Sequence, residues 1–264
     1  MLKNAKALVG FTLKARDGEI GKVEQFYFDD HHWTIRYLVA QTGSWLSGRQ
    51  VLLSPYALGA IDEAAGSVAV DLTKKKIEDS PSIDRDKPVS RRFEIAFYEY
   101  YAWPTYYGGP YLWGAYPEIP AGRALAKNPA PEGKGRDSHL RSTQEVAGYH
   151  IQAQDGELGH VADFLIDDAL WAIRYLVIDT RNWWPGKKVL VSPRWIERVS
   201  WTERKVFVNL SLEAIREAPE FEPGAALTRP QESGLHAHYG RPGYWEDPPL
   251  PGDYRNQLSA RGLL

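Results

Sequence analysis

The sequence predicts an all-β protein made of two small β-barrels as an internal tandem repeat, each followed by an extended, aromatic-rich arm. Short stretches of alternating apolar and polar residues recur between glycines and prolines, as in small barrels and sandwiches. The 264 residues are 12% aromatic and include 18 Pro and 23 Gly, which is typical of strand-rich proteins with many turns. Gly10 and Trp33 recur as Gly148 and Trp171, both 138 residues later (148 − 10 and 171 − 33), so we expect one fold twice.

The first copy begins with a predicted hairpin. Residues 9–15 alternate as a half-buried strand does, and Asp17-Gly18 is the strongest short hairpin signal. Residues 22–29 then form a second strand, in which the alternation slips by one position at Val23. Such a slip indicates a β-bulge.

A paired-aspartate turn at residues 29–30 leads into the next strand, residues 33–40. Both faces of this stretch become apolar toward its end, so we expect a central strand. Short strands at 50–53 and 67–72 follow, and residues 72–78 predict a single helical turn. The second copy repeats this order at the same offset.

Each predicted barrel is followed by an arm that is rich in Tyr and Trp and interrupted by Pro and Gly. So much aromatic area left in water would favour aggregation, so we favour packing on the protein's own barrels or on a second copy of the chain over a partner-binding surface. The predicted organisation is barrel 1 (residues 1–84), aromatic arm 1 (85–120), linker (121–140), barrel 2 (141–222) and a C-terminal arm (223–264) with a disordered end.

Composition narrows the class of protein. With a net charge of −2 and a pI near 6.4, the chain lacks the positive field that binding a nucleic-acid backbone needs. With no Cys, the chain has no disulfide, thiolate nucleophile or sulfur-rich metal site. No apolar run approaches the roughly 20 residues of a membrane span, so we expect a cytoplasmic protein that does not insert into membranes.

A set of repeated motifs marks both copies. Its segments are Gly10, 17–21, Phe26, 29–30, Trp33, 35–39 and 51–55 in the first copy, and 148–151, 155–157, 159–161, 171–175, 183–189 and 192–193 in the second. These motifs resemble the PRC-barrel family. The resemblance implies a small β-barrel that serves as a binding or assembly module, as in the cytoplasmic part of the photosynthetic reaction-centre H subunit and in a ribosome maturation factor, and it carries over no catalytic residue.

The paired aspartates admit two interpretations. Asp29-Asp30-His31-His32 offers carboxylate and imidazole groups to a metal ion, whereas an Asx-type turn needs only the aspartates. We favour the turn, because the second copy keeps Asp167-Asp168 but has Ala169-Leu170 in place of the histidines. A metal site in the first copy remains open.

Two mid-strand arginines, Arg36 and Arg174, belong to the structural repeat with the aspartates and with Trp33 and Trp171. A guanidinium group at this position suits an anionic partner. We favour an ion pair within the chain, to Asp29 or Asp167 among others.

Two loops combine indole rings with cations. Their candidate partner-binding residues are Trp45 and Arg49 in the first copy and Trp183, Trp184, Lys187 and Lys188 in the second. Capping of the barrel end by the indoles is the simplest interpretation. Of the functional ones, a docking site for a protein partner is favoured over stacking of nucleic-acid bases.

No phosphate-binding, nucleophile or zinc-protease motif is present. His236 and His238 would share a ligand if their segment were extended, but Tyr98 and Tyr100 at the matching positions favour aromatic packing. We therefore expect a non-catalytic protein-interaction or scaffold module without a cofactor, compatible with a homo-oligomer. A small-molecule or metal-binding protein and a ribosome- or RNA-associated assembly factor are the alternatives.

Overall fold

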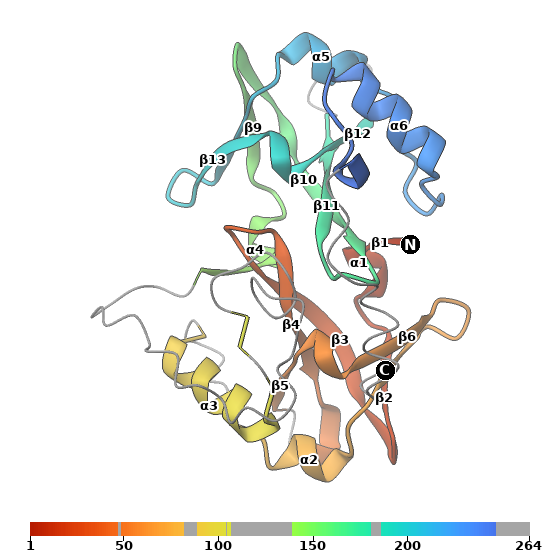
Figure 1. The fold of residues 1–264 in the computed structure, drawn as a ribbon, viewed down its shortest axis with the longest axis vertical. Coiled ribbons are helices and arrows are strands. Elements are labelled where there is room, and N and C mark those ends of the chain that lie inside the picture. The colour runs from red at the N-terminus through yellow and green to blue at the C-terminus, as the bar shows by residue number, and fades with distance from the viewer. Residues whose placement is uncertain (47–48, 82–88, 104, 107–138, 181–185, 247–264) are drawn as a thin grey trace. The chain divides into compact units, whose positions relative to one another are not determined.

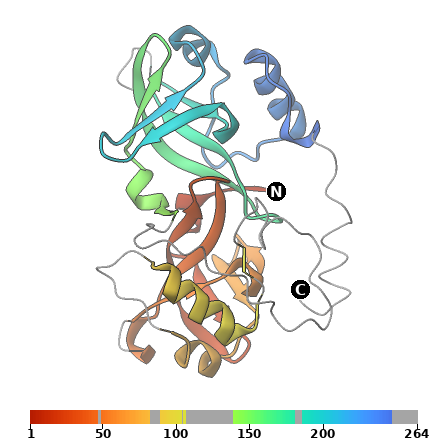
Figure 2. The ribbon, with the colours of Figure 1, turned by 60° about the vertical axis from the view of Figure 1, so that its left-hand side comes forward.

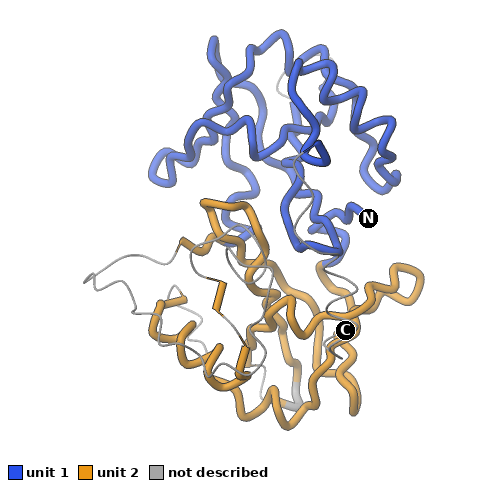
Figure 3. Tube along the Cα trace, in the orientation of Figure 1, with its two compact units in different colours: residues 1–8, 142–249 blue, residues 9–141, 250–264 orange. Residues whose placement is uncertain are grey.

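The described residues form two sheets of seven strands each, with few helices (Figure 1). The computed structural model describes residues 1–46, 49–81, 89–103, 105–106, 139–180 and 186–246. These residues divide into two compact units: unit 1 holds residues 1–8 and the described residues from 142 onward, and unit 2 holds those from 9 to 141 (Figure 3). Within the described ranges, none of the helices combines the length and apolar character needed to cross a membrane.

The sheet of unit 2 has the order β5-β4-β3-β2-β7-β6, and β2 and β7 are its parallel pair. The predicted hairpin is confirmed, because Ala15 lies opposite Gly18. The bulge is confirmed by a register shift between Val23 and Gln25. The strands and main helices of this unit are β2 (Thr12–Ala15), β3 (Gly18–Asp29), β4 (Thr34–Gln41), β5 (Gln50–Leu53), β6 (Leu58–Asp62), β7 (Ser67–Val70), α2 (Lys74–Glu78) and α3 (Arg91–Tyr101), with short 3-10 turns η1 (Gly43–Leu46) and η2 (Pro55–Ala57).

The sheet of unit 1 has the corresponding order, β12-β11-β10-β9-β14-β13, again with one parallel pair, β9 and β14. Its elements are α4 (Thr143–Val146), β9 (His150–Ala153), β10 (Gly156–Asp167), β11 (Ile173–Asp179), β12 (Lys188–Val191), η3 (Pro193–Trp195), β13 (Ile196–Ser200), β14 (Lys205–Val208), α5 (Leu212–Glu217), α6 (Arg229–His238) and η4 (Tyr244–Glu246). Among the described strands, no pairing joins the two end strands of either order.

Each sheet takes its seventh strand from the other half of the sequence. In unit 1, β1 (Leu2–Asn4), which leads into α1 (Ala5–Leu8), pairs antiparallel with β10. In unit 2, β8 (Leu140–Ser142) pairs with β3. Residues 1–8 of the predicted barrel 1 therefore belong to unit 1, and β8 spans the boundary between the predicted linker, which ends at residue 140, and the predicted barrel 2. Strands of three residues are too short to show an alternating pattern.

The paired-aspartate turn differs from the prediction in one respect. Strand β4 begins at Thr34, whereas Trp33 lies in the turn with φ = 54°. Its counterpart Trp171 has the same φ. Trp33 is buried and stacks on Phe28, with ring centroids 5.0 Å apart, so burial of the indole compensates for the unfavourable backbone region. As predicted, β4 is a central strand, between β3 and β5.

The first arm contains the helix α3 over Arg91–Tyr101, where the sequence predicted an extended segment. Ser90 caps α3 by accepting a hydrogen bond from the Phe93 N–H, and Ala102 ends the helix in the left-handed region. The prolines and glycines that suggested an irregular segment all follow Ala102, so they do not interrupt the helix. Figure 2 shows α3 (yellow) beside the sheet of unit 2. Phe97, Tyr98 and Tyr101 of the helix form one buried cluster with Tyr37 and Val39 of β4 and Leu52 of β5.

The second arm also packs within its own unit. His236 of helix α6 and the C-cap residue Tyr239 lie against Trp195, with ring centroids 5.1 and 4.7 Å from that of the indole. The expectation that the arms pack on this chain's own sheets therefore holds for their described parts. The predicted disordered end, residues 247–264, lies outside the described residues.

Candidate functional site

The first aspartate of each pair is a structural residue. Asp29 Oδ1 accepts hydrogen bonds from the backbone N–H groups of His31 (2.8 Å) and His32 (3.2 Å), which is the predicted Asx turn. Asp29 Oδ2 pairs with Arg36 Nη2 at 3.0 Å. Asp167 binds the N–H groups two and three residues later and pairs with Arg174 at 3.0 Å in the same way.

The ionisation of Asp29 follows from these contacts. Burial alone would raise the pKa of its carboxyl group, but the Arg36 charge and the hydrogen bonds from His32 and from the His31 N–H hold this pKa below its ordinary value. His32 Nδ1 lies 3.2 Å from Asp29 Oδ2. Asp29 and His32 therefore contact each other. Of the predicted metal-ligating stretch, Asp30 and His31 are the residues left to bind a metal ion.

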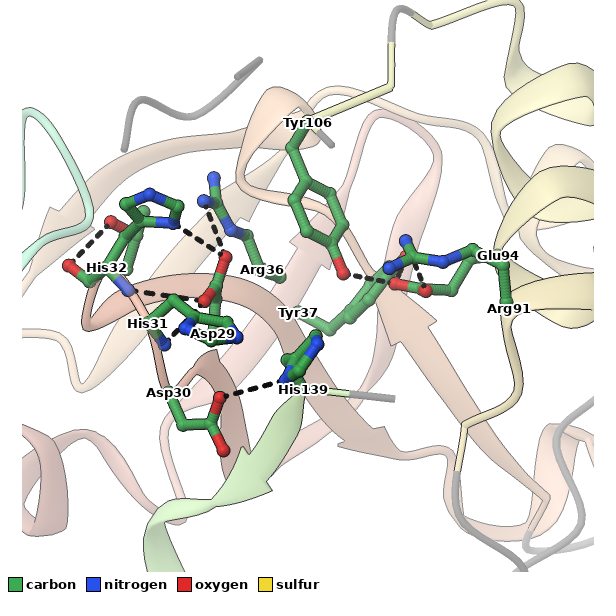
Figure 4. Close-up of polar contacts among 11 residues, drawn as sticks. Asp29, Asp30, His31, His32, Arg36, Tyr37, Arg91, Glu94, Tyr106 and His139 are labelled. Carbon is green, nitrogen blue, oxygen red and sulfur yellow. Dashed lines mark hydrogen bonds and ion pairs between the residues drawn. The ribbon is translucent and has the colours of Figure 1, made fainter. Parts of the chain in front are cut away.

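The other half, Asp30 and His31, lies beside a histidine that the sequence analysis did not include (Figure 4). Ligand atoms of Asp30, His31 and His139 all lie within 4.8 Å of one another. The rings of His31 and His139 have centroids 4.1 Å apart, and His139 Nδ1 lies 3.4 Å from Asp30 Oδ1. His139 precedes the exchanged strand β8, and no spacing in the sequence links it to residue 30.

A buried polar network fastens α3 to the sheet of unit 2. Glu94 is fully buried and accepts hydrogen bonds from the hydroxyl groups of Tyr37 (3.2 Å) and Tyr106, and it pairs with Arg91 at 2.9 Å (Figure 4). The Arg36 guanidinium lies 4.2 Å from the centre of the Tyr106 ring. Burial raises the pKa of Glu94, and the charge of Arg91 opposes this effect.

The same network recurs in unit 1. Glu232 accepts hydrogen bonds from Tyr175 (3.0 Å) and Tyr244 (2.9 Å) and pairs with Arg229 at 2.9 Å. Arg174 lies 4.1 Å from the centre of the Tyr244 ring. Because both copies use these residues to hold their helices, we assign the network to stability. Sequence reasoning missed it, since Glu94 resembles an ordinary acidic residue in a first helical turn.

The two histidines of α6 do not share a ligand. His236 is buried, with Nε2 3.0 Å from the Tyr175 hydroxyl and Nδ1 2.8 Å from the Pro242 carbonyl oxygen. His238 Nε2 lies 2.7 Å from the carbonyl oxygen of Ala214. The helix directs the rings to different partners, so aromatic packing is the better description of His236.

Two of the predicted partner-binding cations have contacts inside their units. Arg49 donates from Nη2 to the Ser80 carbonyl at 2.7 Å, and Lys187 Nζ donates to the Ala218 carbonyl at 2.5 Å. Ser80 and Ala218 follow α2 and α5, so these cations satisfy carbonyl groups beyond helix ends. Trp45 lies in η1, with its side chain outside the description, and Trp183 and Trp184 lie outside the described residues.

The remaining predicted cation, Lys188, lines a surface groove of about 740 Å³ in unit 1. Lys6, His160, Asp163 and Asp179 supply the other ionisable side chains of this Lys188 groove. Burial raises the pKa of Asp163, and the hydrogen bonds that its carboxylate accepts from the N–H groups of Phe164 and Lys6 only partly oppose this rise. The positions 138 residues away in the sequence carry Gln144 for Lys6 and, within unit 2, Lys22 for His160, Gln25 for Asp163, Gln41 for Asp179 and Gln50 for Lys188.

Two surface features of the described residues therefore combine charge with a place for a ligand: the Lys188 groove, and the cluster of Asp30, His31 and His139. No protein-family model matches the chain, and a search of curated proteins returns no match.

Proposed function

We propose that this protein is a non-catalytic interaction module, built from two PRC-like barrels, that holds an acidic segment of a protein partner in the Lys188 groove. The fold part of the proposal is supported by the common strand order of the two sheets and by the Asx turn and Arg ion pair found in both. The observation that carries the function is the charged lining of the Lys188 groove, because at the corresponding positions of the other copy only Lys22 is ionisable.

The lining suits a carboxylate-bearing peptide. Lys6 is exposed and Lys188 and His160 are half-buried, so cationic donors are accessible along the groove. The volume lies within the range of roughly 300–1,000 Å³ that is typical of ligand sites.

The exchanged N-terminal segment positions one side of this groove. The backbone N–H of Lys6 donates to Asp163 Oδ1 at 3.0 Å, next to a register shift of β10 between Val161 and Asp163. Lys6 therefore depends on the docking of residues 1–8 onto β10. Gln50 in unit 2 is hydrogen-bonded to Glu24 at 2.6 Å, and that copy provides an internal control.

Site-specific photo-crosslinking in cells tests the proposal. A benzoylphenylalanine at Ala162, which lines the Lys188 groove, is expected to capture one partner through an acidic segment, whereas the same group at the matching Glu24 captures none. A synthetic peptide of that segment should bind the full chain at least tenfold more weakly after Lys188→Glu. Equal capture at both positions, or unchanged peptide affinity after Lys6→Glu and Lys188→Glu, would refute the proposal.

A further inference from the structure

We propose that Asp30, His31 and His139 form a binding site for a divalent transition metal ion, with zinc the best match. Two imidazoles and one carboxylate are a common ligand set for zinc, which a water molecule completes to four. The three ligand atoms lie within 4.8 Å of one another. Bonds of about 2.0–2.2 Å at tetrahedral angles place ligand atoms about 3.4 Å apart, the separation already found between His139 Nδ1 and Asp30 Oδ1.

The movement that metal binding requires is confined to side chains with room to move. His31 and His139 are exposed, and 47% of the His139 side-chain surface is accessible. Rotation of two exposed rings needs no change in the backbone. Asp30, whose side chain is only 9% accessible, is the fixed ligand around which the imidazoles close.

Surrounding contacts orient the ligands as they do in established metal sites. Arg141 Nε donates to Asp30 Oδ2 at 3.0 Å, which leaves Oδ1 directed toward His139. The backbone of His31 is held by Asp29 Oδ1. Partners of this kind fix the orientation of ligating side chains and strengthen metal binding.

Two separate segments contribute to the site, and the backbone holds them together. The N–H of Asp30 donates to the carbonyl oxygen of His139 at 2.9 Å. A bound ion would therefore connect the β3–β4 turn to the start of the exchanged strand β8. An ion that binds only the folded state stabilises that state. We therefore expect the ion to stabilise the pairing of β8 with the sheet of unit 2.

Unit 1 lacks the imidazoles at the corresponding place. Asp168 donates its N–H to the carbonyl oxygen of Met1 at 3.0 Å, and Ala169 stands where His31 stands in unit 2. The backbone arrangement is thus shared, and only the ligating side chains differ. His32, which contacts Asp29 rather than Asp30, offers a second control.

Zinc titration of the full chain by isothermal calorimetry tests the inference. We expect one tight equivalent, with affinity at least tenfold weaker in Asp30→Asn, His31→Ala and His139→Met but changed less than threefold in His32→Ala. Circular dichroism and metal-free melting establish that each variant folds. Hydrogen exchange should show zinc slowing the Asp30 amide in wild type and leaving Asp168 unchanged. Equal zinc affinity in wild type, His31→Ala and His139→Met, or an equal loss in His32→Ala, would overturn the site.

Discussion

The backbone N–H of Asp30 donates a hydrogen bond to the carbonyl oxygen of His139, although the two residues belong to different halves of the sequence. In the equivalent hydrogen bond of unit 1, the backbone N–H of Asp168 donates to the carbonyl oxygen of Met1. Together with the β1–β10 and β8–β3 pairings, these bonds make each unit depend on a segment encoded in the other half of the chain.

Deletion of residues 1–8 should destabilise unit 1 rather than unit 2, where the rest of the first copy lies. The deletion removes strand β1 and the buried side chains of Ala5 and Leu8, a loss of about 3–4 kcal/mol. Hydrogen exchange should accelerate strongly at the Asp168 amide and little at the Asp30 amide. Equal acceleration at both amides would contradict the assignment of residues 1–8 to unit 1.

Glu94→Ala should cost about 3 kcal/mol of unfolding free energy, because it leaves two buried tyrosine hydroxyl groups and Arg91 without their shared acceptor. Glu232→Ala should cost a similar amount in unit 1. Urea unfolding measures both. Glu99→Ala, on the exposed face of the same helix, is the control and should change stability by less than about 0.5 kcal/mol.

His236 should make unit 1 less stable in mild acid. Burial lowers the pKa of His236 in the folded protein, and hydrogen bonding to the Pro242 carbonyl oxygen only partly opposes this effect. The unfolded chain has a histidine pKa of about 6.5, so it binds the proton more readily. The stabilisation is complete above that pH and is lost as the pH falls below it.

Replacement of His236 by tyrosine, the residue at the corresponding position 98, should reduce this pH dependence. The measurement is the urea midpoint of unit 1 between pH 7.5 and pH 5.5. A wild-type midpoint that does not fall over this range, or a fall of the same size in His236→Tyr, would contradict the prediction.

Gly21→Ala should be more damaging than Gly10→Ala, although both glycines have positive φ. A Cβ atom at Gly21 would lie 2.1 Å from the carbonyl oxygen of Gln41, whereas one at Gly10 would meet nothing within 4 Å. We expect a loss above about 2 kcal/mol for Gly21→Ala and about 1 kcal/mol for Gly10→Ala. Urea unfolding of the two variants side by side checks the order, which equal losses would contradict.

Local signals predicted local structure well. The Asp17-Gly18 hairpin, the bulge after Val23 and the Asx turn at Asp29 all depend on a few neighbouring residues, and all are present. The helical turn at α2 was predicted for the same reason. The α3 helix was missed because Pro and Gly beyond its end were taken to interrupt it.

Long-range pairing could not be predicted in this way. A three-residue strand such as β8 has no detectable period, and its partner is selected by tertiary packing. The position of His139 beside Asp30 follows from that pairing. Two of the three residues of the candidate metal cluster, Asp30 and His31, were therefore predictable from the sequence, and of the Lys188 groove only Lys188 was.

The exchange of strands also sets an order of events during protein synthesis. Chains grow at about 5–20 residues per second, and β10 is made only after all the described residues of unit 2 have been translated. Residues 1–8 must therefore wait for roughly 10–30 s without their strand partner, while the sheet of unit 2 is completed when β8 leaves the ribosome. The pairing of β1 with β10 therefore joins the earliest-made residues to a strand that is translated after the described residues of unit 2.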